Sequence, residues 1–280
     1  MTSADLGVRA DRPGTSRPVG ALNRTSGIGL GVTMTWFSLL VLIPLAAVIA
    51  TATEGGVEAF WRAVSNEQTA HAIRLTVVSA LAVTVTNVFA GTAIAWVLVR
   101  DRFPGKAVLE VLIDIPFALP TIVAGLVLLS LYGQDSPLGI DVANSSLSVY
   151  LAFLFVTLPF VVRTVQPVLE ELDVEIEEAA ASLGASRFTT FTRIILPTLT
   201  PAIAAGATLS FARGVGEYGS LVLLSGNLPF ESEVASVRIL SAIENDNPAA
   251  AASVATLLLI VALVVILLLD FIQRRVARRG

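Results

Sequence analysis

Two oppositely charged residues, Arg213 and Glu217, lie four positions apart inside a long apolar run. On an α-helix this spacing places both side chains on one face. A charge at the centre of a membrane-spanning helix costs about 2.5–3.5 kcal/mol in insertion measurements, so it normally faces the protein interior or a water-filled cavity. Arg213 can therefore line a path for an anion, with Glu217 neutralising and orienting it. The alternative is a mutual ion pair that only fixes helix packing.

Glycine is frequent around this charged pair. Gly214, Gly216 and Gly219 allow either close helix packing or a local break in the helix. We therefore predict a substrate pathway at this point of the chain. It is formed by Arg213, Gly216, Glu217 and Tyr218.

The polar segment 163–197 is a second candidate site, because it is longer than a simple connector between two apolar runs. Its sequence predicts two short helices. Asp173 can cap the first, and Gly184 can end it, since glycine tolerates the left-handed conformation that follows many helices. Ser186 can cap the second helix, and we expect Pro197 to end it before the next membrane span starts.

The first of these short helices has one apolar face, formed by Ile176, Ala179, Ala180 and Leu183 at spacings of three and four residues. The small alanines on this face allow another chain to approach closely. The segment can be an elbow at the membrane surface that docks another protein, or simply a solvated amphipathic loop. Spacing alone does not distinguish these interpretations.

The sequence lacks the residues that several other kinds of chemistry require. It has no cysteine and a single histidine, His71, so disulfides are excluded and a metal site of His and Cys is not expected. The only lysine, Lys106, does not belong to a phosphate-binding loop, because Arg100 occupies the first glycine position and Ala107 follows the lysine. No His, Asp and Glu cluster recurs across the apolar runs, which argues against an integral-membrane enzyme. The net charge of −4 gives no indication of nucleic-acid binding.

Composition places these residues in a membrane protein. The chain is 55% hydrophobic and 14% charged, with a mean hydropathy of +0.80, whereas a soluble domain is roughly 25% charged. Because a helix needs about 20 apolar residues to cross a bilayer, we predict an all-α integral membrane protein with a six-span bundle over residues 28–271. The predicted spans are 28–52, 70–99, 117–132, 147–162, 201–225 and 249–271, with the elbow at 163–197, a disordered cytoplasmic tail at 1–27 and a basic cytoplasmic tail at 272–280.

The basic residues are distributed unevenly between the two sides of these spans. Most of the 18 lie in the terminal tails and in the loops after the second and fourth spans, whereas Arg62, Arg74 and Arg238 lie on the other side. The basic side is normally cytoplasmic, so both termini are expected inside the cell. His71 then lies at the external end of the second span and Asp114 at the cytoplasmic entry of the third. The external segments are acidic, and this charge does not steer anions toward the protein.

The elbow also carries a sequence motif. It matches the EAA signature of permease subunits of bacterial ATP-binding cassette (ABC) importers and is formed by Glu178, Ala179, Ala180, Gly184, Ile194, Leu196 and Pro197. In that family the elbow is a coupling helix that docks on the ATPase subunit, so the resemblance implies that these residues form the ATPase-coupling surface. A sensor or a structural membrane protein would account for the apolar runs but not for this motif.

From the first apolar run onward, the chain resembles the CysT-type permeases of sulfate/thiosulfate importers. The similar segments are RFPGK (102–106), DIPFALPTIVAGL (114–126), PFVVRTVQPVLEEL (159–172) and SFARGVGEYGS (210–220). The resemblance implies a multi-pass subunit of the bacterial inner membrane that forms half of a pore and binds no cofactor itself, with ATP and Mg on its ATPase partners. The implied partners are a second, CysW-like permease, two CysA-like ATPase subunits, an external sulfate/thiosulfate-binding protein and membrane lipid. Because molybdate permeases share parts of the last three segments, a molybdate/tungstate importer permease is the alternative.

Overall fold

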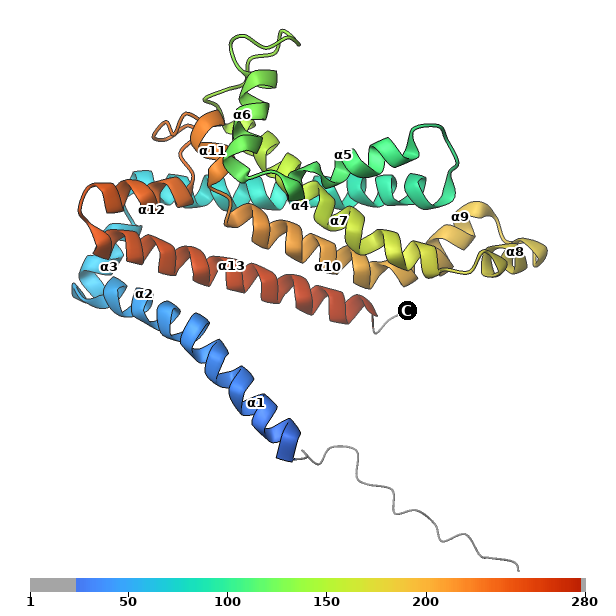
Figure 1. Cartoon of the computed structure of the whole chain (residues 1–280), viewed down its shortest axis with the longest axis horizontal. Helices are drawn as coiled ribbons and strands as arrows, with labels where there is room; N and C mark the ends of the chain where they lie inside the picture. Colours follow the sequence, from blue (N-terminus) through green and yellow to red (C-terminus); the bar gives the residue numbers. More distant parts are fainter. Residues whose placement is uncertain (1–23, 278–280) are drawn as a thin grey trace, which may run out of the picture. The chain divides into compact units, whose positions relative to one another are not determined.

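A computed structural model describes residues 24–277, and the regular elements in this range are all helical, as expected. The longest helices are α4 (Glu67–Arg100), α7 (Ser146–Glu171), α10 (Leu196–Val215) and α13 (Pro248–Ala277) (Figure 1). The shorter helices that follow Thr53 are α3 (Gly56–Val64), α5 (Lys106–Ala118), α6 (Thr121–Tyr132), α8 (Val174–Ser182), α9 (Arg187–Thr190), α11 (Gly219–Leu224) and α12 (Ala235–Glu244). The predicted tail at 1–27 lies mostly outside the described residues, whereas residues 272–277 of the predicted basic tail continue α13 as helix.

The chain divides into two units, and the first ends at Ala47. Its described part contains α1 (Arg24–Phe37), a π-helical turn (Ser38–Leu42) and the start of α2 (Ile43–Thr53). The N–H of Ile43 donates to the carbonyl of Ser38, five residues earlier, directly before Pro44. A π-helical turn at this point lets the helix continue although proline supplies no N–H. Residues Ser26–Thr53 are long and apolar enough to cross a membrane.

Three helices of the second unit, α4, α7 and α10, pack against one another and form its centre. Val161 of α7 lies between two glycines. A Cβ atom on Gly91 of α4 would lie 2.8 Å from the Cβ of Val161, and one on Gly206 of α10 would lie 2.9 Å from its Cα. Small residues of this kind allow helices to approach closely inside a membrane. Two buried apolar clusters extend from this contact, one containing Phe153, Phe211 and Leu221 and the other Leu98, Leu169 and Leu199.

Within residues 24–277, five helices are long and apolar enough to cross a membrane. They are Ser26–Thr53, Glu67–Arg100, Ser146–Glu171, Arg187–Val215 and Pro248–Arg275. The third predicted span, 117–132, is instead divided between the end of α5 and α6, which has 12 residues. The division falls at Leu119-Pro120, because a residue before proline favours the extended conformation that Leu119 adopts. By itself α6 is shorter than the roughly 20 residues that a full span needs.

The elbow region differs from the prediction at Pro197. This proline does not end the second elbow helix, and Thr200-Pro201 does not start a new one, because Arg187–Val215 is continuous. Residues Phe191–Ile195 form a π-helical turn in which the N–H of Leu196 donates to the carbonyl of Phe191. Pro197 directly follows this turn, and the shifted hydrogen bonds let the helix continue although proline supplies no N–H. As a result, one continuous helix connects the elbow to the bundle.

Two other predicted spans have different ends in the structure. The fourth was predicted to end at Val162, but α7 continues to Glu171 and includes Pro159 and Pro167. The fifth was predicted as one span over 201–225 whose glycines allow close packing or a local break, and residues 216–218 do separate α10 from α11. Glycines in membrane helices permit such breaks, and this break contains three of the four predicted pathway residues, Gly216, Glu217 and Tyr218.

Candidate functional site

The break between α10 and α11 is the structural setting of the predicted pathway. The backbone N–H of Glu217 donates to the carbonyl of Gly214 at 3.1 Å, and Tyr218, with φ −134° and ψ −51°, leads the chain into α11. The sequence analysis placed Arg213 and Glu217 on one helical face, whereas Glu217 lies in the turn that follows α10. The two residues nevertheless meet, because the turn keeps Glu217 close to the last turn of the helix.

Arg213 and Glu217 form an ion pair in which Nη1 and Oε2 are 2.6 Å apart. The Glu217 side chain is only 1% exposed, and its Oε1 accepts hydrogen bonds from the N–H and the hydroxyl of Ser220, each at 2.9 Å. The hydroxyl of Ser236 donates to the backbone carbonyl of Glu217 at 2.7 Å. Glu217 is therefore a buried junction that joins the end of α10, the first turn of α11 and α12.

The other predicted pathway residues reach the surface of the chain beside this junction. The Arg213 side chain is 31% exposed, and Gly216 and Tyr218 are exposed. A guanidinium group has five N–H donors, and one buried carboxylate does not use them all. The arrangement therefore leaves Arg213 able to contact a second anion while Glu217 fixes its position.

The start of α6 packs directly against the broken helix. A Cβ atom on Gly125 would lie 2.6 Å from the backbone oxygen of Ser220, and one on Gly219 would lie 3.0 Å from the nitrogen of Ile122 and would also collide with the hydroxyl of Thr121. Both positions therefore require glycine at this helix separation. Sequence reasoning singled out Gly219 but missed Gly125, whose only signal was a glycine in an apolar run.

Asn87 is a second polar feature that sequence reasoning missed. It lies on α4, is completely buried, and donates through Nδ2 to the hydroxyls of Thr157 on α7 at 2.7 Å and Ser210 on α10 at 3.1 Å. These hydrogen bonds join the three central helices. A single amide inside the apolar run 70–99 was the available signal, because amides are rare within membrane spans and pair with neighbouring helices.

The two predicted helix ends in the elbow are confirmed. Gly184 has φ +82° and follows α8, whose end is closed by hydrogen bonds from the N–H of Ala185 to the carbonyl of Ala180 and from the N–H of Gly184 to that of Ala181. The hydroxyl of Ser186 caps α9. Asp173 occupies the N-cap position of α8, but its side chain makes no capping hydrogen bond.

The predicted apolar face of α8 is not buried as a unit. Only Ala180 is buried, whereas Ile176 is 44% exposed, Leu183 is 89% exposed and Ala179 is exposed. The reason is that α8 packs mainly on the short α9 and not on the bundle. Ile176, Ala179 and Leu183 form an exposed apolar patch on one face of α8, whereas Val174 and Phe188, also exposed, line a groove together with Glu177 and Glu178. A patch of this kind is typical of a protein–protein contact.

The remaining motif residues divide between the two parts of the elbow. Glu178 lies exposed on α8, whereas Ile194, Leu196 and Pro197 lie on the continuous helix that follows α9. Ile194 is half-buried there, and Leu196 and Pro197 are exposed. The motif therefore covers both a surface helix and the root of a transmembrane helix.

A groove of about 720 Å³ runs beside α8 and is lined by Trp96, Glu177, Glu178 and Phe188, among others. At its edge, Nη2 of Arg100 lies 2.6 Å from Oε1 of Glu177, and the guanidinium carbon of Arg100 is 5.9 Å from the centroid of the Trp96 ring. The ion pair joins the last residue of α4 to α8. The elbow is thus tied by a side-chain contact to a helix that belongs to the central core.

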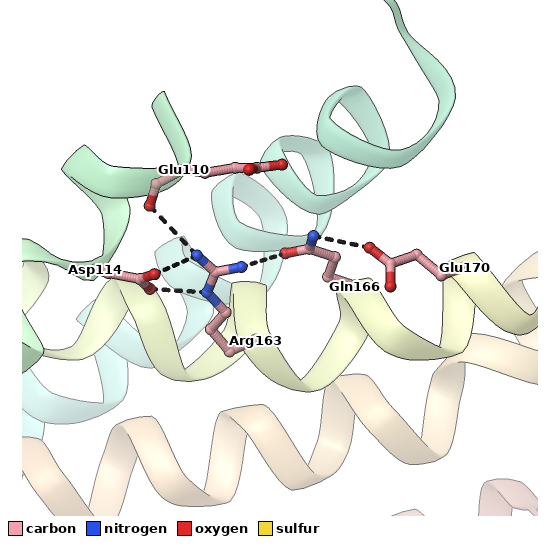
Figure 2. A network of polar contacts seen from close by, with 5 residues as sticks. All are labelled: Glu110, Asp114, Arg163, Gln166 and Glu170. Atoms are coloured by element: carbon pink, nitrogen blue, oxygen red, sulfur yellow. Dashed lines mark hydrogen bonds and ion pairs between the residues drawn. The ribbon is translucent and has the colours of Figure 1, made fainter. Parts of the chain in front are cut away.

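A third polar cluster holds α5 against α7 (Figure 2). Arg163 donates through Nε to Asp114 at 2.8 Å, makes a second hydrogen bond to the same carboxylate, and also contacts the carbonyl of Glu110 and the side chain of Gln166. Gln166 in turn donates to Glu170 at 2.9 Å. Asp114 was predicted to mark the cytoplasmic entry of a span, and the structure shows that it serves as the partner of an arginine.

Histidine and carboxylate side chains do not assemble into a metal site in the described part of the chain. His71 is half-buried, with its ring centroid 6.0 Å from that of Phe230. Among residues 24–277, no group of three or more His, Asp or Glu side chains could hold a metal ion.

Comparison with solved structures supports the fold. This chain superposes on a chain of a bacterial ABC transporter involved in the import of the acidic polysaccharide alginate, with a TM-score of 0.73 and 16% identity over 89% of this chain and 94% of that one. It also superposes on a chain of the MetNI methionine ABC transporter in an inward-facing conformation, with a TM-score of 0.51 and 17% identity over 76% and 98% of the two chains.

Comparison of sequences identifies much closer relatives. The chain is 44% identical to the sulfate transport system permease protein CysT of Synechocystis sp. over 84% of its length and 87% of the relative's. It is 41% identical to the protein of the same name from Escherichia coli over 80% and 83% of the two lengths. Residues 87–279 match the family described as the inner membrane component of binding-protein-dependent transport systems. The chain therefore belongs to this family of ABC importer permeases, and is a transport component rather than an enzyme.

Proposed function

We propose that this chain imports sulfate as one of two permease subunits of an ABC importer. The observation that carries the proposal is the identity of 41–44% to two sulfate transport permeases over most of the chain. These relatives favour sulfate over the molybdate or tungstate alternative. Thiosulfate, a tetrahedral dianion like sulfate, is a further expected substrate of the same subunit.

The anion pathway is proposed to pass Arg213, with Gly216 and Tyr218 beside it. A planar guanidinium group suits an oxyanion because its N–H donors can bind two oxygens at once. The Glu217 carboxylate holds Arg213 in place: its Oε2 pairs with the guanidinium group, and its Oε1 accepts two hydrogen bonds from Ser220. In the pore, the second permease would cover the exposed side of this arrangement.

The elbow is proposed to couple transport to ATP hydrolysis. Its exposed apolar residues and Glu178 would dock on an ATPase subunit, and the continuous helix Arg187–Val215 would carry the displacement to the break at residues 216–218. ATP and Mg would be bound by that partner, since this chain has no phosphate-binding loop.

The family description implies an external binding protein, and membership of the ABC importers implies an ATPase. We propose the finer composition of one CysW-like permease, two CysA-like ATPase subunits and a sulfate/thiosulfate-binding protein that works in the same assembly. The chain is a multi-pass protein of the inner membrane, and we propose that both of its termini are cytoplasmic.

The decisive experiment measures uptake of radiolabelled sulfate in a bacterial strain whose own CysT-type permease is deleted. The chain is expressed there together with the partner subunits encoded beside its own gene. We expect sulfate uptake to be restored, and unlabelled thiosulfate to compete with it more strongly than molybdate does. The matched control carries Glu178→Arg, which lies outside the bundle and should leave the amount of membrane-inserted protein unchanged.

A different substrate would be recognised directly in this assay. Uptake of labelled molybdate with no uptake of sulfate, at the same level of membrane-inserted protein, would refute the sulfate assignment and favour the alternative. Sulfate uptake by the Glu178→Arg variant at the wild-type rate would support the assignment of sulfate as substrate but refute the coupling role of the elbow.

A further inference from the structure

A cavity of about 390 Å³ lies where α3, α12 and the beginnings of α4 and α13 meet, at one end of the second unit (Figure 1). Two arginines line it, Arg62 from α3 and Arg238 from α12. The sequence analysis placed only three basic residues on the external side of the membrane, and two of them are these arginines. The positive charge of an otherwise acidic face is therefore concentrated in one cavity.

The two arginines are not neutralised by carboxylates of the described chain. Within residues 24–277, neither takes part in an ion pair, and the cavity lining includes no Asp or Glu. The acids on the surrounding segments lie outside the lining: Glu54, Glu58, Glu67, Glu244 and Asp246 are exposed, and the buried Glu233 accepts a hydrogen bond from Gln68 at 2.6 Å. Two like charges facing one cavity create a positive potential that an anion relieves.

Arg238 is held in position by its surroundings. Its Nε donates to the hydroxyl of Thr69, which is buried, at 3.4 Å, and this leaves its two Nη groups without a hydrogen bond inside residues 24–277. Arg62 is exposed, so the cavity is accessible from solvent. Because both arginines line the same cavity, their guanidinium groups can bind one small anion together.

The remaining polar groups of the lining can also serve an anion. Asn66 and Asn247 use their side-chain oxygens to cap backbone N–H groups at the starts of α4 and α13, which leaves their amide N–H₂ groups as donors. The positive ends of these two helix dipoles have the same sign as the arginines.

We propose that this cavity is an external binding site for a sulfate-class oxyanion, distinct from the pathway at Arg213. It would retain the anion after its release from the binding protein, on a face whose other charges repel it. The external placement rests on the proposed orientation, but binding itself does not, because both faces of the purified protein are accessible in detergent. The alternative occupant is a carboxylate side chain of the binding protein, which the experiment distinguishes.

The test uses the absence of cysteine from the sequence. Ala242→Cys places a single thiol in the cavity, and the matched control Ala143→Cys places one in a separate cavity that contains Asp135. Both alanines are half-buried. Each purified variant, in the assembled importer, is treated with two thiosulfonate reagents, one carrying a sulfonate and one a quaternary ammonium group. The thiolate attacks the reagent's sulfur and releases sulfinate, and the ratio of the two rates cancels differences in thiol reactivity.

We expect the ratio of the sulfonate rate to the ammonium rate to be about tenfold higher at Ala242→Cys than at Ala143→Cys, because two arginines line the cavity of the first thiol and Asp135 lines that of the second. Sulfate at its dissociation constant should slow the sulfonate reaction about twofold in Ala242→Cys, since half of the sites are then occupied. Chloride at the same ionic strength should not. Adding Arg62→Gln, which changes an exposed side chain and leaves the core intact, should reduce both effects, and Arg238→Gln should act in the same direction.

Three results would overturn the proposal. Equal ratios at the two cysteines would show that the cavity is not electropositive. Equal slowing by sulfate and chloride would show charge screening without a site. Protection by the sulfate-free binding protein but not by sulfate would assign the cavity to a protein carboxylate. Normal sulfate uptake with any of these results would refute the cavity site and leave the proposed transport function standing.

Discussion

Removing Arg213 alone should destabilise the protein more than removing both charges of its ion pair. Glu217 is 1% exposed, so Arg213→Ala would leave a buried carboxylate without its cation. Breaking a buried ion pair in this way costs about 3–5 kcal/mol. We expect about 3 kcal/mol, the lower end, because Arg213 is 31% exposed and Ser220 would still donate two hydrogen bonds to the carboxylate. For a chain of this size, such a loss lowers Tm by about 6–12 °C.

The double variant Arg213→Ala/Glu217→Gln separates packing from transport. Glutamine keeps an oxygen that can accept the two hydrogen bonds of Ser220, so the start of α11 remains capped, and no buried charge remains. We expect its free energy of unfolding to recover to within about 1 kcal/mol of the wild type. If Arg213 serves the anion, this stable variant should still fail to import sulfate. Arg213→Lys keeps the charge without the planar fork, so its uptake should be reduced but measurable.

The assay requires two independent measurements on each variant. Thermal unfolding of the purified importer gives stability, and uptake of labelled sulfate, normalised to the membrane-inserted protein, gives transport. Uptake by the double variant close to the wild-type rate would refute the pathway role and leave the ion pair as packing alone. A Tm of Arg213→Ala that equals the wild-type value would refute the argument from the buried charge.

Three further predictions concern orientation and coupling. Reporter fusions after Pro137 and after Gly280 should report opposite sides of the membrane, and reports from the same side would contradict the proposed orientation. Glu178→Arg should abolish sulfate uptake while ATP hydrolysis continues, and a phosphate-release assay on the purified importer would measure the hydrolysis. A rate of hydrolysis that still rises when sulfate-loaded binding protein is added would contradict uncoupling. Arg100→Glu should reduce the coupling between ATP hydrolysis and sulfate uptake, because it breaks the contact of α4 with α8. The exchange Arg100→Glu/Glu177→Arg should restore most of this coupling. If the exchange restores none of it, the ion pair does not transmit the coupling between the elbow and the bundle.

Local sequence signals predicted those features of the elbow that depend on neighbouring residues. Gly184 ends α8 and Ser186 caps α9 because each acts on backbone groups within a few residues. Pro197 misled the prediction for a physical reason. A proline normally ends the helix that precedes it, but the π-helical turn Phe191–Ile195 shifts the hydrogen bonds and lets one helix continue through Arg187–Val215. The other π-helical turn, Ser38–Leu42, likewise ends two residues before a proline, Pro44, so the proline itself was the available signal.

Features that depend on distant contacts were outside the reach of sequence reasoning. The glycines at 214, 216 and 219 were compatible with either a close contact or a break, and the structure contains both. Asn87 was not recognised because its partners, Thr157 and Ser210, lie 70 and 123 positions away. The spacing of apolar residues correctly predicted that α8 is a helix with one apolar face. Burial of that face would require a neighbouring helix, and the bundle does not place one there.

The helix α12 connects the proposed external site to the proposed pathway. Its Ser236 holds the backbone of Glu217 at 2.7 Å, while Arg238, two residues further along the same helix, lines the external cavity. The N–H of Ala235 donates to the buried hydroxyl of Thr76 at 2.8 Å, which fixes the start of α12 to α4. Any displacement of the break at residues 216–218 would therefore act on the helix that carries Arg238. An acidic external face is therefore compatible with anion import, because the anion would meet Arg238 in the cavity and Arg213 in the pathway, and α12 connects these two places. These local charges matter more for the anion than the average charge of the surface.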